Sequence, residues 1–249
     1  MQFNKYHKLL TDQAYQGKIL LKRILGYPEP FLCIITPIFD EAVTSLKGLI
    51  ADLQKQSHSN FIHILISNGP SPAIRNLITE IRKTDHRFAY DEMVYDPHYQ
   101  QSHDFRDLFG NIGARRDYVM QKYHAARYLN LGADFLITDV DFIEKLYLTH
   151  CKSNKDIILI NSLLNGEVFP KFPLKLTHLD LSNFCYSKSI AKHYHYPHDY
   201  DPAYPAANDY RFFEKISNMT SLDGVYGVKD GRASYKGLGE LYQESKIQN

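Results

Sequence analysis

The strongest constraint on the fold is the apolar segment at residues 31–38, which no polar alternation interrupts. Such a run is typical of a central parallel strand that is buried on both faces. Residues 42–53 then repeat apolar side chains at helical spacing, residues 61–66 form a second apolar strand, and a helix is predicted around residues 73–83. This order of strand, helix, strand and helix predicts an α/β fold with a Rossmann-like, mostly parallel central sheet flanked by helices.

The later part of the chain continues the pattern less regularly. A helix is predicted from about Ala114 to Leu131, and a strand from Asp134 runs directly into Asp139 and Asp141. Residues 157–160 predict another strand, a last helix is expected to begin near Asp209, and the five glycines of residues 224–239 indicate a loop. No linker or repeat interrupts the chain, so we expect one domain over residues 1–249.

Composition excludes several classes of protein. Lys and Arg total 29 against 28 Asp and Glu, so the basic excess expected of a nucleic-acid binder is missing. Three widely spaced cysteines, Cys33, Cys151 and Cys185, imply no disulfide framework. No apolar stretch reaches the length of a signal peptide or a transmembrane segment. We therefore expect a cytoplasmic protein, and the composition leaves peripheral attachment to a membrane open.

Asp139 and Asp141 are the first candidates for chemistry. Ligands of open parallel sheets bind beyond the carboxyl ends of the strands, and these two carboxylates follow a predicted strand. Residues two apart in an extended segment point to the same side, so the pair can share Mg²⁺ or Mn²⁺. A solvated loop or a helix cap is the structural alternative.

Other candidates also have two interpretations. Asn68 ends the second strand, where it can read a base edge or simply form a turn with Gly69. Arg115 and Arg116 open a predicted helix, whose first amides favour anions. Asn208 and Asp209 precede the last helix, so they can cap it, or Asp209 can act as a general base.

A dense histidine cluster lies between these segments. His193, His195 and His198 raise the possibility of zinc, but no carboxylate or cysteine nearby has the spacing of a structural zinc site. Contact with an acceptor, together with Asp180 and Asn183, is the better interpretation.

The ordered set of motifs resembles the inverting family 2 glycosyltransferases of the GT-A fold. The similar segments are FLCIITPIFDE (31–41), FIHILISNGP (61–70), NIGARR (111–116), DVD (139–141) and ND (208–209). The resemblance covers roughly residues 30–215. It implies a nucleotide-binding half at about 30–145 and an acceptor-binding half at about 146–249.

The resemblance also implies roles for single residues. Asp141 would bind Mn²⁺ or Mg²⁺, with Asp139 at the ribose and beside the metal, and Asp209 would deprotonate the acceptor hydroxyl. The donor would be a nucleotide-sugar, with UDP favoured, and the acceptor a glycan or a lipid-linked hydroxyl in surface polysaccharide synthesis. The implied donor-binding residues are Thr36, Pro37, Glu41, Asn68, Arg115, Arg116 and Asp139.

Two other functions remain open at this point. A sugar nucleotidyltransferase shares the α/β plan, but it usually has a Gly-rich, basic loop after the first strand, and residues 36–41 contain neither glycine nor lysine. A binding module that has lost catalysis would also keep the fold. The acidic residues Asp139, Asp141 and Asp209 argue against that alternative.

Overall fold

A computed structural model describes residues 29–38, 43–93, 105–153, 155–164, 167–170, 181–193 and 219–229. Strands and helices alternate through the first half of the chain, as the apolar pattern predicts. The elements are β1 (Leu32–Ile38), α2 (Val43–Gln54), β2 (Phe61–Asn68), α3 (Pro72–Ile81), β3 (Phe88–Met93), α4 (Phe105–Lys122), β4 (Arg127–Asn130), β5 (Phe135–Ile137), α5 (Phe142–Lys152), β6 (Ile157–Leu164), β7 (Glu167–Phe169), a 3-10 turn (Leu181–Asn183), β8 (Phe184–Ser187), α6 (Lys188–His193) and β9 (Met219–Lys229).

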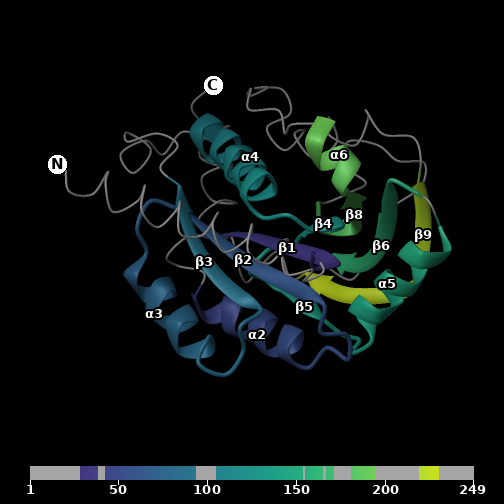
Figure 1. Cartoon of the computed structure of the whole chain (residues 1–249), viewed down its shortest axis with the longest axis horizontal. Coiled ribbons are helices and arrows are strands. Elements are labelled where there is room, and N and C mark those ends of the chain that lie inside the picture. The colour runs from purple at the N-terminus through teal and green to yellow at the C-terminus, as the bar shows by residue number, and fades with distance from the viewer. Residues whose placement is uncertain are drawn as a thin grey trace.

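The described strands form one nine-stranded sheet of order β3-β2-β1-β4-β8-β6-β9-β5, with β7 paired to β6 (Figure 1). β1 lies between two parallel neighbours, with Leu32 in register with Phe61 of β2 and Arg127 of β4. β8 runs antiparallel to both β4 and β6, and β5 runs antiparallel to β9. The sheet is therefore mixed but mostly parallel, which confirms the predicted fold class.

Helices cover both faces of the sheet and bury two apolar layers. α2, α3 and α5 lie on one face, and α4 and α6 lie on the other (Figure 1). Alternate residues of β1 divide between the layers, because Ile34 packs on the first face and Cys33 on the second. Among the described helices, none combines the length and apolar character that a membrane crossing requires.

The predicted helix over residues 114–131 is wrong at its end. α4 stops at Lys122, and Arg127–Asn130 forms β4, the strand beside β1. All four β4 residues are buried, including Arg127, whose guanidinium donates to the carbonyl of Lys155 at 2.5 Å and to His150 Nδ1 at 3.1 Å. The charged residue and the short length hide this strand from a periodicity argument.

The loop expected from residue 224 onward is also wrong over its first part. Residues 219–229 form β9, which pairs with β6 on one side and with β5 on the other. Gly227 serves this packing, since a Cβ built there would lie 2.1 Å from the Phe135 ring. A glycine here allows close contact between neighbouring strands, and it marks no turn.

Candidate functional site

The parallel strands β1, β2, β3 and β4 end together at one edge of the sheet. Ile38, the last residue of β1, is in register with Ser67, and Asn68 is in register with Met93 of β3. Ligands of open α/β sheets bind at such carboxyl ends. This edge, called the carboxyl edge below, is therefore the candidate site.

Arg115 supports the carboxyl edge from inside the protein. It is fully buried, and its Nη1 donates to the carbonyl of Ile38 at 3.1 Å and to that of Ile66 at 3.5 Å. α4 begins at Phe105, so Arg115 lies in the body of the helix and the expected helix start at this position is wrong. Arg115 therefore holds the ends of β1 and β2 together, and its contact with a donor stays a prediction. Arg116 beside it is half-buried.

Thr36 of β1 also makes its side-chain contact inside the protein. Its side chain is fully buried and lies 2.8 Å from Nε2 of His63, which projects from β2 into the same layer. Burial lowers the pKa of His63 to about 3, so the ring is neutral at physiological pH. The Thr36 side chain therefore packs in the interior, and contact between this residue and a nucleotide stays a prediction. Pro37 is half-buried.

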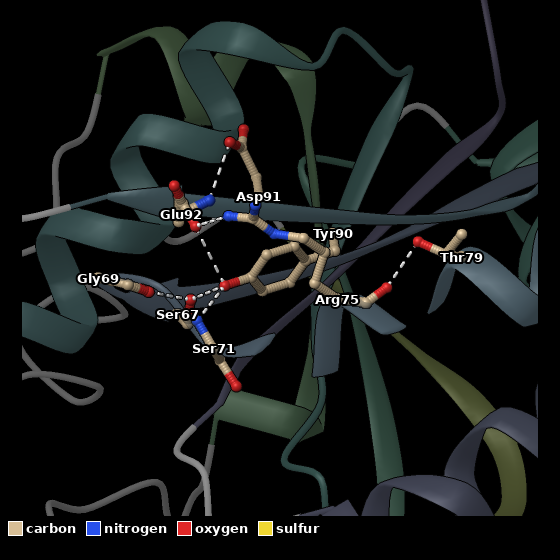
Figure 2. A network of polar contacts seen from close by, with 8 residues as sticks. All are labelled: Ser67, Gly69, Ser71, Arg75, Thr79, Tyr90, Asp91 and Glu92. Carbon is tan, nitrogen blue, oxygen red and sulfur yellow. Dashed lines mark hydrogen bonds and ion pairs between the residues drawn. The ribbon is translucent and has the colours of Figure 1, made fainter. Parts of the chain in front are cut away.

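The turn after β2 is held by a chain of hydroxyl groups (Figure 2). The Ser71 amide donates to the Tyr90 oxygen at 2.8 Å, and Ser67 Oγ lies 2.7 Å from the same oxygen. Ser67 Oγ also donates to the carbonyl of Gly69 at 2.6 Å. Gly69 has a φ of 82°, in the left-handed region that glycine adopts readily, and its amide donates to the carbonyl of Met93. A turn is confirmed here, and it sits on the carboxyl edge.

An ion pair borders this turn on its exposed side. Arg75 of α3 donates to Glu92 Oε2 at 2.6 Å, and its guanidinium lies 5.7 Å from the centre of the Tyr90 ring (Figure 2). Sequence reasoning missed Tyr90, Glu92 and Arg75. Glu92 at the end of β3 was the available signal, since a carboxylate near a strand end is a candidate by position.

Asp139 and Asp141 lie away from the carboxyl edge. The carbonyl of Asp139 accepts from Gln56 Nε2 at 2.9 Å, and that of Val140 accepts from the Ser57 amide at 2.9 Å. Gln56 and Ser57 connect the end of α2 to the start of β2, so they lie at the amino ends of the parallel strands. The prediction that Asp139 and Asp141 share an edge with Asn68 is therefore wrong.

The contacts of Asp139 are those of a local cap. One carboxylate oxygen accepts from the Asp141 amide at 2.8 Å, and the other lies 2.5 Å from Lys145 Nζ. The hydrogen bond from Lys145 holds the pKa of Asp139 below its usual value. Asp141 stands at the N-cap position of α5. The structural alternative, a turn that starts a helix, thus describes this segment.

Asp134 is the carboxylate that follows the carboxyl end of β4. The Leu131 amide still donates to the carbonyl of Ile35 in β1, and a turn closed by the Phe135 amide and the Gly132 carbonyl comes next. Asp134 lies in this turn and is 7% exposed. The helix predicted over residues 114–131 covers β4, so the pattern places the strand end at Asp139 and hides Asp134.

Asn183 is placed in the core. It is fully buried, and its amide nitrogen donates to Ser162 Oγ at 2.8 Å and to the carbonyl of Ile160 at 3.0 Å. It fixes the backbone of β6, so the expected acceptor contact is wrong for this residue. The remaining candidates lie outside the described residues; they are Glu41, Asp180, His195, His198, Asn208 and Asp209, together with the side chains of Asn68 and His193.

The described residues contain no group of three or more acidic, histidine or cysteine side chains placed to hold a metal ion. At the carboxyl edge they offer one carboxylate in the turn after β4, Asp134. Mg²⁺ and Mn²⁺ sites in nucleotide enzymes often use one or two carboxylates and complete their coordination with phosphate oxygens. A single carboxylate fits that chemistry.

Comparison with known proteins finds solved structures with a similar fold. The sequence matches no protein-family model and no curated protein. Residues 1–349 of TarS from S. aureus, solved with UDP-GlcNAc, align with a TM-score of 0.61 and 13% identity over 87% of this chain and 65% of that one. The UDP complex of the same TarS fragment gives 0.62 and 13% over 80% of this chain and 60% of the fragment.

A second solved protein has a similar fold. The mannosyltransferase PcManGT from Pyrobaculum calidifontis, solved with GDP-Man and Mn²⁺, aligns with a TM-score of 0.58 and 10% identity over 95% of this chain and 73% of that one. At such identities the likeness establishes the fold, which is of GT-A type. The chain spans 60% of the length of the TarS fragment in its UDP complex.

Proposed function

We propose that this chain is a glycosyltransferase that takes a sugar from a nucleotide-sugar, with UDP as the first nucleotide to test, and passes it to a hydroxyl acceptor with inversion. The observation that carries the proposal is the sheet itself. Its fold aligns with those of proteins solved with UDP-GlcNAc and with GDP-Man, at TM-scores of 0.61 and 0.58. The turn at Ser67–Ser71 and the acidic residue Asp134 both belong to its carboxyl edge. A glycan or lipid-linked acceptor in polysaccharide synthesis remains part of this proposal.

Roles follow from position and from the family resemblance. The Asn68–Gly69 turn would face the base, and Asp134 would be the protein ligand of Mn²⁺ or Mg²⁺. When bound, such a metal neutralises negative charge that builds on the departing diphosphate. Asp209 would accept the proton of the acceptor hydroxyl, as the general base of a single displacement.

The proposal is tested first by binding, because no acceptor is then needed. Titration calorimetry with UDP or GDP, with and without Mn²⁺, should show metal-dependent binding to the wild-type chain. Asp134→Asn should remove the metal dependence, whereas Asp141→Asn should keep it, since the turn at Asp141 lies at the amino ends of the strands. Both variants should melt within a few degrees of the wild type.

Transfer of the sugar is tested with a variant of Asp209. Asp209→Asn should bind UDP and Mn²⁺ normally and lose roughly 10²–10⁴-fold in transfer, the usual contribution of a general base. Absence of metal-dependent nucleotide binding in the wild type would refute the proposed function. Loss of binding in Asp141→Asn, with binding intact in Asp134→Asn, would instead restore the metal motif expected from the sequence.

A further inference from the structure

The hydroxyl chain beneath the Asn68–Gly69 turn has a defined direction. Ser67 has one hydroxyl proton, and it goes to the carbonyl of Gly69 at 2.6 Å. Since the Ser71 amide donates to the Tyr90 oxygen, the Tyr90 proton is the one available for the 2.7 Å contact with Ser67 Oγ. The donors and acceptors therefore follow the order Ser71, Tyr90, Ser67 and Gly69. Apart from Tyr90, every member of this chain belongs to the turn after β2.

Tyr90 is the member of this hydrogen-bonded chain that comes from outside the turn. It comes from β3, where it is in register with Leu65, so its hydroxyl crosses to the turn from the neighbouring strand. Burial raises the pKa of the Tyr90 hydroxyl, which keeps its proton in place at neutral pH. Glu92 Oε2 lies farther away, at 3.4 Å, and is already bound by Arg75. Ser67 is thus the nearer acceptor for the Tyr90 proton.

We infer that Tyr90 is a positioning residue for nucleotide selection, because its hydroxyl fixes the backbone conformation of the Asn68–Gly69 turn. This inference rests on the proposed function, in which that turn faces the base. Hydrogen-bonded reading of a base needs donors and acceptors in fixed places, and a site built this way rejects a mismatched ligand strongly. Tyr90 acts through the turn and touches no ligand in this scheme.

The test compares nucleotides in the full chain. Affinities for UDP and GDP, each with Mn²⁺, are measured by calorimetry for the wild type, Tyr90→Phe and Ser67→Ala. Tyr147→Phe is the matched control, since Tyr147 is 37% exposed and lies on α5, away from the turn. We expect Tyr90→Phe to weaken the preferred nucleotide about tenfold. The weaker nucleotide should change little, so the ratio of the two affinities falls.

A general loss of structure would lower both affinities together and would also lower the melting temperature. Amide exchange gives a readout that needs no ligand, because the Ser71 amide should exchange faster in Tyr90→Phe. If Tyr90→Phe does not fold, Ser67→Ala breaks the same chain and takes its place. An unchanged affinity ratio, or unchanged exchange at Ser71, would overturn the inference. A wild type that binds neither nucleotide would refute the proposed function itself.

Discussion

His63 should make the folded chain sensitive to mild acid. Burial lowers the pKa of its ring from 6.5 to about 3. Between pH 6.5 and pH 3 the ring is therefore protonated in the unfolded chain and neutral in the folded chain. Stability is therefore fully present above pH 6.5 and falls as the pH drops toward 3. pH 5 lies about 1.5 units below the unfolded-state pKa, so proton binding to the unfolded chain lowers the free energy of unfolding by about 2 kcal/mol.

The assay is urea unfolding followed by circular dichroism at pH 7.5 and pH 5.0. Every carboxylate and exposed histidine also contributes, so the useful quantity is the difference between the wild type and His63→Gln, in which those contributions cancel. The wild type should lose about 2 kcal/mol more than His63→Gln between the two pH values. His86→Gln is the control, because His86 is exposed and its replacement leaves the buried Thr36–His63 pair in place. Equal pH dependence in the wild type and His63→Gln would refute the assigned burial of the Thr36–His63 pair.

Three further substitutions test the packing around the candidate site. Gly227→Ala should destabilise the chain by about 1–3 kcal/mol, since the new Cβ would lie 2.1 Å from the Phe135 ring; a melting temperature equal to wild type would contradict this packing. Gly48→Ala in α2 should be neutral or stabilising by about 0.5–1 kcal/mol, because its 3.3 Å contact is with the Leu136 side chain, which is 45% exposed and can move. Arg115→Lys should lower stability, because a lysine cannot reproduce the guanidinium geometry between the ends of β1 and β2. Denaturant titration measures all three, and a stable Arg115→Lys protein would argue against that bracing role.

The sequence predicted the first half of the fold well because that half obeys simple periodicity. The apolar strands at 31–38 and 61–66 and the helix at 42–53 became β1, β2 and α2 with boundaries shifted by one or two residues. Continuous apolar runs have few alternatives in a chain of this length. The α/β class followed from those elements alone.

The site was predicted less well, and the cause is β4. This strand has four residues and buries an arginine, so neither length nor hydrophobicity marks it. Because the predicted helix covers β4, the pattern assigns the next acidic motif, Asp139 to Asp141, to the carboxyl edge. Its true neighbours, Gln56 and Ser57, can be found only when the direction of β5 is known. The pairing of β5 with β9 determines the edge of the sheet on which Asp139 and Asp141 lie, and the local sequence pattern does not contain that pairing.

The strand pairing of β5 has a consequence for the order in which the protein is assembled. Among the described strands its partner is β9, and the two pair across the interval from Ile137 to Gly227. During synthesis, β5 leaves the ribosome long before that partner exists, and β9 must then enter between β5 and the already present β6. A nascent chain that stalls before Met219 would carry β5 as an unpaired ribbon, exposed to chaperones or to strands of other chains.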